Sequence, residues 1–524
     1  MRVGTLGLVA LATLVLAVAA VAKTAQHDAS TTLLRVGTVR DVTTWDPIKS
    51  FSTEVYYMAN IYEGLVVANP PTAKKRFSPG LATNWGRSAD GKTWTFRLRQ
   101  NVKFSNGEPL TSDAVRDSIQ VAAKRGGASF IWAPLDSIDT PNNWTVVFHL
   151  SYAAPIPLIA ASEYGGWIVC PEALKAVAAS PSYFESGKTC GTGPYKLKSY
   201  SPGSQIVLEQ NKDYWGGWKN NQFENLAFQI SAEPIALQQA LVSGQIDVAQ
   251  QVPQENFAKL AKNSKYTGYV DDASFNYTGF FNTTRPPLNN TLVRRALSYA
   301  VPYDDIVKIG AGGYGTPARS AVPKGIFPYN PTTPQYTQDL AKARQLLTQA
   351  GHKGGGFSLN LTYAAQNQAE TRFAPLIKDA FKKVGVTVNV KGILFNQQWA
   401  AAKADPTKAQ DIFLLLYWPT YSDAGSDNLW SMFHSSKKPF FNLSYWVSPA
   451  YDKLVDDAGA ITATDPKGSY AKYGQAMKLL YQAAPGFFLY DAQDFFVTTK
   501  SVSAKSALNI NYPFVEFFYT MKKV

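Results

Sequence analysis

The sequence predicts an α/β fold, and the pattern of its second half indicates that class. Residues 411–417 form an almost unbroken apolar run, which is typical of a strand buried on both faces of a parallel sheet. Strand patterns at 359–363 and 386–390 precede this run, and amphipathic helical patterns over 372–384 and 397–403 separate the three strands. Strands and helices in this order are typical of open α/β sheets, in which ligands bind beyond the carboxyl ends of the strands.

The N-terminal half is predicted to contain mainly short strands. Asp90-Gly91 is a turn signal, and apolar residues then alternate with polar ones over 94–98, as a half-buried strand requires. Gly191 and Gly193 are expected in a tight turn, because no Gly-Lys-Ser/Thr follows them as in a phosphate-binding loop. The other elements expected here are strands at 33–38, 146–150 and 206–209 and helices at 55–63 and from Ser112 onward.

An amphipathic helix is expected over residues 292–301. Its apolar residues predict one buried face, and Arg294, Arg295 and Ser298 are predicted to face the solvent. Pro302 stops the helix, and a glycine-rich segment follows. Further helices are expected at 339–350, 451–460 and 470–481, and a strand at 495–499.

Length, composition and charge indicate a folded protein of two or three domains. The chain has 524 residues, of which 45% are hydrophobic and 13% aromatic. Only 17% of the residues are charged, yet the formal net charge is +13. Basic residues form no run longer than Lys74-Lys75-Arg76, which argues against a nucleic-acid partner. An acid-poor surface suited to an acidic or wall-facing environment is the interpretation we favour.

The N-terminus resembles a Sec signal peptide over residues 1–22. Arg2 supplies the positive charge, residues 6–22 carry none, and Ala20-Val21-Ala22 offers a cleavage site. The apolar run is shorter than the roughly 20 residues of a membrane-spanning helix, although an uncleaved anchor is the alternative. No cysteine follows that could carry a lipid. We therefore expect an exported protein, either periplasmic or at the cell surface.

Cys170 and Cys190 are the two cysteines of the chain. They lie close in sequence, and in an oxidising compartment they are expected to form one disulfide, which stabilises the fold by about 3 kcal/mol. Two free buried thiols are the alternative.

Four blocks of the sequence, at 90–121, 191–197, 211–216 and 281–323, resemble one known family. The first reads Asp-Gly-Lys-Thr-Trp-Thr-Phe-Arg-Leu-Arg and continues into a helix, and the second reads Gly-Thr-Gly-Pro-Tyr-Lys-Leu. In this order the blocks resemble the extracytoplasmic solute-binding proteins of peptide- and nickel-type ABC importers, family 5. One departure is Ala114, where the family usually has an acidic residue.

The resemblance implies a type II periplasmic-binding-protein fold with two lobes and a hinge. The hinge would be formed by two crossovers, near 275–282 and near 489–496. The boundaries that it implies are 31–277 plus 490–524 for lobe I, an extra subdomain at about 66–198 within it, and 278–489 for lobe II.

The resemblance also implies a binding protein that is not an enzyme. Such a protein captures oligopeptides or similar small solutes outside the membrane and delivers them to a permease with its ATPase. We expect a monomer with no cofactor and no metal. A secreted peptide hydrolase is the main alternative, but the chain has neither Gly-x-Ser-x-Gly nor His-Glu-x-x-His, and its four histidines lie far apart. A binding protein for an oligosaccharide or a metal chelate is the other alternative.

The candidate ligand-binding residues begin directly after the buried strand, with Trp418, Tyr421 and Asp423. In peptide-binding relatives, an aspartate about three residues after the corresponding tryptophan pairs with the ligand's α-amino group. Tyr421 occupies that position here. Either Asp423 serves instead, or the anchor has been lost and specificity has moved away from ordinary peptides, because a buried unpaired ammonium costs several kcal/mol. A turn rich in Ser, Asp and Gly is the structural alternative.

Trp45 and Glu54 complete the set, because they come from a region that faces the cleft in similar proteins. Phe275 and Trp399 could add aromatic walls. For each of these aromatic residues, packing in the core is the alternative.

Overall fold

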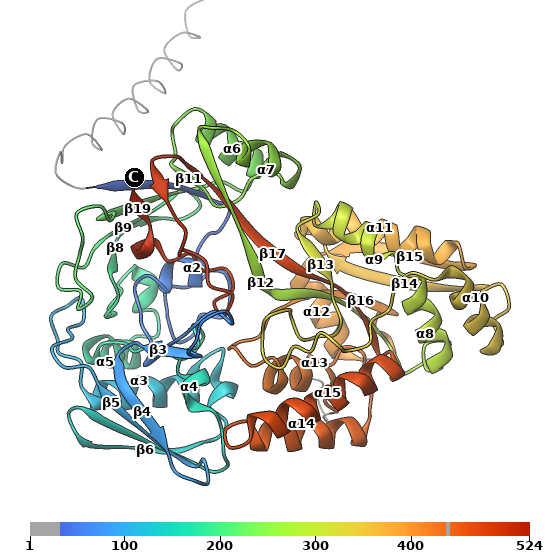
Figure 1. Cartoon of the computed structure of the whole chain (residues 1–524), viewed down its shortest axis with the longest axis horizontal. Coiled ribbons are helices and arrows are strands. Elements are labelled where there is room, and N and C mark those ends of the chain that lie inside the picture. The colour runs from blue at the N-terminus through green and yellow to red at the C-terminus, as the bar shows by residue number, and fades with distance from the viewer. Residues whose placement is uncertain (1–31, 436–440) are drawn as a thin grey trace, which may run out of the picture.

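The computed structural model describes residues 32–435 and 441–524 (Figure 1). The predicted signal peptide, residues 1–22, lies outside the described residues. Within them, none of the helices combines the length and the apolar character needed to cross a membrane.

A mixed sheet of eleven strands runs through the described part of the molecule. Its order is β15-β14-β16-β12-β17-β11-β1-β10-β9-β8, and β13 (Gly315–Pro317) pairs with β17. The long strands β12 (Tyr266–Phe281) and β17 (Gly486–Thr499) are antiparallel, with register shifts between residues 272 and 278. Figure 1 shows this pair running from one part of the molecule to the other. We call the part with β1–β11, β18 and β19 lobe I, and the part with β13–β16 and α8–α15 lobe II.

The predicted strand and helix alternation of lobe II is confirmed. β16 is parallel to β14, which is parallel to β15, and five of the six residues of β16 are buried, as its apolar run predicted. The elements are β14 (Phe357–Ala364), α11 (Gln368–Lys382), β15 (Val386–Ile393), α12 (Phe395–Ala404) and β16 (Ile412–Tyr417).

Helices surround this sheet in lobe II, and polar side chains cap several of them. Ser448 accepts a hydrogen bond from the Tyr451 amide, and Asp465 accepts one from the Gly468 amide, so each satisfies an otherwise unpaired donor at a helix start. These helices are α8 (Thr291–Ala300), α9 (Tyr303–Asp305), α10 (Leu340–Gln349), α13 (Trp430–Phe433), α14 (Pro449–Ile461) and α15 (Pro466–Ala483), with π-helical turns at Ile306–Gly310 and Gly425–Leu429.

The prediction that α8 exposes Arg294 and Ser298 is wrong. Arg294 is 3% exposed and Ser298 is fully buried. The Arg294 guanidinium donates hydrogen bonds to the carbonyls of residues 483–484 at the end of α15 and to those of residues 288–289. Carbonyls at a helix C-terminus have no donor within the helix, and the buried guanidinium donates hydrogen bonds to them instead. Burial lowers the pKa of Arg294 to about 10.

Lobe I contains the other end of the sheet. β1 pairs in parallel with β10, and β8, β9 and β10 are antiparallel neighbours. Gly203 has a φ of +69°, a conformation that favours glycine in the turn between β8 and β9. The elements are β1 (Leu33–Thr38), β8 (Tyr195–Ser201), β9 (Gln205–Gln210), β10 (Asn225–Ile230), α6 (Pro234–Val242), β11 (Val248–Ala249), α7 (Gln254–Ala261), β18 (Val502–Ser503) and β19 (Lys522–Lys523).

A separate antiparallel sheet lies inside the predicted subdomain 66–198. Its order is β4-β5-β7-β6, and α3, capped by Thr111, contacts β6 and β7. The elements of this region are β2 (Val66–Ala68), β3 (Phe77–Pro79), β4 (Ala82–Arg87), β5 (Thr93–Leu98), α3 (Ser112–Arg125), β6 (Leu135–Asn142), β7 (Thr145–Leu150), α4 (Ile156–Ile159) and α5 (Pro171–Ala179), with 3-10 turns at Ser129–Trp132 and Phe184–Ser186.

The helix expected over residues 55–63 is shorter, since α2 is Val55–Met58. The carbonyls of Asn60 and Ile61 accept hydrogen bonds from the amides of Tyr195 and Gly193, so the backbone leaves the helix to pair with that segment. A Cβ on Gly193 would lie 2.7 Å from the Ile61 carbonyl oxygen. The glycine is therefore required by a close backbone approach rather than by a positive φ.

The boundaries of the lobes remain a prediction. The two expected crossovers, 275–282 and 489–496, overlap β12 and β17, the pair that joins the two parts of the sheet.

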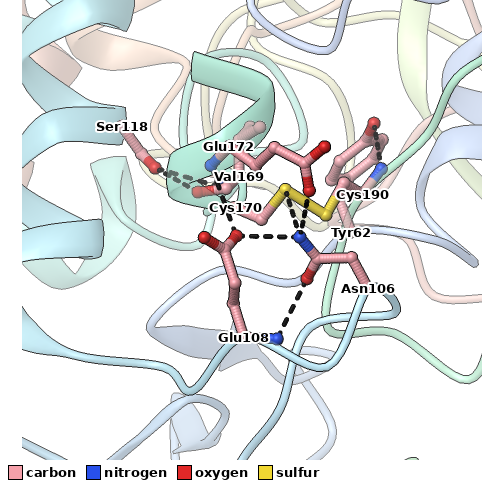
Figure 2. The surroundings of a disulfide bond; sticks show 8 residues. All are labelled: Tyr62, Asn106, Glu108, Ser118, Val169, Cys170, Glu172 and Cys190. Atoms are coloured by element: carbon pink, nitrogen blue, oxygen red, sulfur yellow. Dashed lines mark hydrogen bonds between the residues drawn. A yellow bond between two sulfur atoms is a disulfide. The ribbon is translucent and has the colours of Figure 1, made fainter. Parts of the chain in front are cut away.

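The structure contains the predicted disulfide between Cys170 and Cys190, and both residues are buried (Figure 2). Their backbones are also joined, because the Cys170 amide donates to the Cys190 carbonyl. Beside the sulfurs, the Asn106 amide donates to the carboxylates of Glu108 and Glu172. The bridge therefore ties the start of α5 to the segment that leads into β8.

We expect the unfolded, unreduced protein to contain no thiol that a maleimide reagent can label. Reduction should lower the free energy of unfolding by about 3 kcal/mol, because the open chain gains conformational entropy when unfolded. Denaturant titration with and without reductant measures the difference. Two labelled thiols in the unreduced protein would contradict the disulfide.

Candidate ligand-binding site

A cavity of about 720 Å³ opens in lobe I and reaches lobe II. It is lined by parts of the segments 59–72, 161–167 and 505–520, by Asp271 and Asp272 of β12, and by Lys324 and Gly325 of lobe II. Its volume is within the range of pockets that hold small molecules.

Several charged groups line this cavity. Lys324 Nζ is 3.0 Å from Asp272 Oδ2, so an ion pair links lobe II to β12. Glu63 accepts hydrogen bonds from Thr192, Tyr214 and Trp215, and burial raises its pKa to about 7. Both carboxylates have partners within the protein.

Trp418 lies where the two lobes meet, directly after β16. It is half-buried, and its ring meets Phe514 of the C-terminal segment edge-on, with centroids 5.0 Å apart. Phe514 in turn stacks on Phe275 of β12, with centroids 5.2 Å apart. Phe514 therefore contacts both Trp418, a predicted ligand-binding residue, and Phe275, a predicted aromatic wall.

The loop after β16 also contacts the lining of the cavity. The Ser162 hydroxyl donates a 2.7 Å hydrogen bond to the Thr420 carbonyl, and the Arg76 guanidinium donates a 3.4 Å bond to the Ser422 carbonyl. Ser162 lines the cavity, so the predicted binding loop and the cavity are neighbours.

Asp423 is fully buried and has partners inside its own loop. Its carboxylate accepts hydrogen bonds from the amides of Gly425 and Ser426 and from the Ser426 hydroxyl. Burial raises its pKa, and the charge of Arg76 opposes this. This geometry matches the structural alternative of a polar turn, and the role of Asp423 as an amine anchor remains a prediction. Tyr421 is half-buried in the same loop.

Trp45 and Glu54 pack within lobe I. Trp45 is 1% exposed and contacts the rings of Tyr57 and Tyr200. Glu54 is also 1% exposed, and it accepts hydrogen bonds from the hydroxyls of Thr43 and Ser50. Neither residue lines the 720 Å³ cavity. Their ligand contacts remain predictions.

Trp399 lies away from the cavity. It packs against Phe395 and Phe441 within lobe II, as in the core-packing alternative.

The residues around Arg40 were not among the predicted site residues. Its guanidinium lies 4.9 Å from the Tyr56 ring centre and 5.3 Å from that of Phe514, and it donates to the Phe514 carbonyl. Burial raises the pKa of the nearby Glu516 to about 7, and the charge of Arg40 opposes this. The position of Arg40 beside Phe514 could not be predicted, because contacts between distant segments leave no periodic pattern in the sequence.

Glu163 was also missed, although the sequence contains a signal for it. It is the one charged residue in the stretch 152–171, which is otherwise apolar or neutral. It is 3% exposed and lines the cavity. An isolated charge in such a stretch is rarely buried without a partner or a function.

Two of the histidines have acidic neighbours. His149 Nε2 is 2.9 Å from Asp139, and His434 Nε2 is 3.2 Å from Asp456. Within residues 32–435 and 441–524, no three His, Cys, Asp or Glu side chains converge as metal ligands.

Comparison with known proteins shows extensive similarity. Residues 76–440 match the family described as bacterial extracellular solute-binding proteins, family 5 Middle. The chain is 30% identical over 416 residues to the probable D,D-dipeptide-binding periplasmic protein DdpA of Escherichia coli K12, with 78% of each chain covered. It is 25% identical over 478 residues to the glutathione-binding protein GsiB of Salmonella typhimurium, with 88% of each chain covered.

Solved structures show the same fold. The periplasmic binding protein DppA of Helicobacter pylori, in complex with the peptide STSA, matches with a TM-score of 0.78 at 22% identity. The match covers 94% of this chain and 98% of that protein. The predicted two-lobed α/β fold is therefore confirmed.

Proposed function

Because the chain belongs to the bacterial extracellular solute-binding proteins of family 5, we propose that it captures short peptides or similar small solutes and delivers them to the permease of an ABC importer, whose ATPase supplies the energy. It acts outside the membrane, in the periplasm or at the cell surface. It binds its ligand without converting it.

The observation that carries this proposal is the cavity of about 720 Å³ beside the contact between the lobes. Its volume suits a small molecule, and its lining combines aromatic side chains with a few charged groups, as ligand pockets do. Cross-lobe contacts at Ser162 and Thr420 and at Trp418 and Phe514 lie next to it.

These contacts also provide a mechanism for coupling. A ligand that touches both lobes stabilises the closed arrangement over the open one, so the fraction of closed protein reports occupancy. The permease then needs only to recognise the closed form. β12 and β17 are the segments that must bend, since they join the parts of the sheet on either side.

Peptides are the ligand class that we favour. DdpA is named for binding D,D-dipeptides and GsiB for binding glutathione, which is itself a peptide derivative. An oligosaccharide or a metal chelate is the alternative ligand.

Thermal unfolding of the purified protein tests this function. A ligand present at a hundred times its dissociation constant should raise the free energy of unfolding by about 2.7 kcal/mol, because it binds the folded state alone. We expect one class within a panel of short peptides, oligosaccharides and metal chelates to raise the melting temperature. Mass spectrometry of the same samples should find the peptides intact.

An unchanged melting temperature across the whole panel would argue against a receptor. Shortened peptides would support the rival hypothesis of a hydrolase.

A further inference from the structure

Glu163 differs from the other buried acidic residues of the described chain. Among the residues that the structure describes, neither of its carboxyl oxygens has a hydrogen-bond donor. In residues 32–435 and 441–524, every other buried Asp or Glu side chain has a partner for its carboxylate, as with Glu54, Asp423 and Glu516. A buried carboxyl group without a donor destabilises the fold, so its presence calls for another explanation.

No cation within the described chain pairs with Glu163. Arg40 is the charged group whose field acts on it, but the Arg40 guanidinium donates to the Phe514 carbonyl instead. Burial raises the pKa of Glu163 well above its usual range, and Arg40 opposes this only in part. The described residues therefore supply no cation to pair with the ionised form of Glu163.

The position of Glu163 is that of a ligand contact. It lines the 720 Å³ cavity, and the preceding residue, Ser162, donates the hydrogen bond to Thr420 across the lobes. Its carboxyl oxygens are covered in this structure, so a ligand in the cavity reaches them only after the side chain or the lobes move.

We infer that Glu163 is the anchor for a ligand ammonium group, the α-ammonium of a short peptide being the source we favour. An ammonium offers three donors and one positive charge, which satisfy a carboxylate that has neither. The inference rests on the proposed function. It places the amine contact in lobe I, whereas Asp423 in lobe II already has its hydrogen bonds within its own loop.

The experiment compares alanine peptides of two, three and four residues with their N-acetylated forms, using isothermal titration calorimetry. The wild type should bind at least one free peptide 10-fold or more tightly than its acetylated form. Glu163→Gln keeps the size and removes the charge, and it should weaken binding of that free peptide by roughly 30-fold or more. Its affinity for the acetylated form should stay the same. Glu172→Gln, an exposed glutamate of the same lobe, is the matched control and should bind as the wild type does.

Three results would overturn the inference, and they differ in their consequences for the proposed function. If the wild type binds free and acetylated peptides equally, or if Glu163→Gln binds the free peptide as the wild type does, the anchor is wrong and the receptor function stands. If the wild type binds none of these peptides, both the proposed peptide ligand and the proposed amine anchor are wrong. The wild-type comparison needs no variant, so it can overturn the inference even if Glu163→Gln does not fold.

Discussion

Replacing Arg294 by Met should lower the free energy of unfolding by about 3–5 kcal/mol, because it leaves buried carbonyls without donors. The guanidinium of Arg294 donates to carbonyls at the end of α15 and before α8, and the side chain is 3% exposed. Methionine fills much of the volume but supplies no hydrogen bond. Urea denaturation of the variant and the wild type measures the difference.

Arg344→Met is the matched control. Arg344 also donates to a carbonyl at a helix end, that of Lys383 after α11, but it is exposed. Water can replace that single hydrogen bond, so the control should lose less than about 1 kcal/mol. Equal losses in both variants would show that the buried network of Arg294 adds nothing to stability.

The protein should be more stable at pH 5 than at pH 8. Burial raises the pKa of Glu370 and of Asp491 to about 8, and that of Glu516 to about 7. In the unfolded chain these groups lose their protons near pH 4, so between about pH 4 and 8 the folded state binds more protons than the unfolded state. The free energy of unfolding therefore falls as the pH rises through that window. Each pKa unit is worth about 1.4 kcal/mol, so the total loss should be several kcal/mol.

Glu370→Gln tests this assignment. Glu370 is 1% exposed and accepts a hydrogen bond from the Ala364 amide, a bond that the side-chain carbonyl oxygen of glutamine can still accept. The variant should lose less stability than the wild type between pH 5 and pH 8. Asp379→Asn, on an exposed position of the same helix, should leave the pH dependence unchanged. A wild-type stability that rises from pH 5 to pH 8 would contradict the prediction.

Much of the fold could be predicted from the sequence, because local patterns determine it. The apolar run that became β16 and the alternation that became β5 are direct consequences of which faces are buried. Arg294 could not be predicted in the same way. Its burial depends on carbonyls of residues 483–484, which are distant in the sequence, and a helical pattern contains no information about them.

The candidate site was predicted less well than the fold. The position of Trp418 after a buried strand placed it at the contact between the lobes. Trp45 and Glu54 were chosen from their place in the chain, and the structure packs both inside lobe I. Glu163 was missed because its distinguishing feature is the lack of hydrogen-bond donors around its carboxyl oxygens, and only the three-dimensional packing shows this.

The pairing of β17 between β11 and β12 has a consequence for how the protein matures. β17 is made after all of lobe II, yet it completes the sheet that lobe I began with β1, and it pairs Asp494 with Asp271. Contacts between such distant segments form slowly. A nascent chain that has not yet delivered β17 leaves β11 and β12 with unpaired edges, which can join strands of other chains. Separation of the emerging chain from its copies until β17 has been made therefore favours correct pairing of these strands.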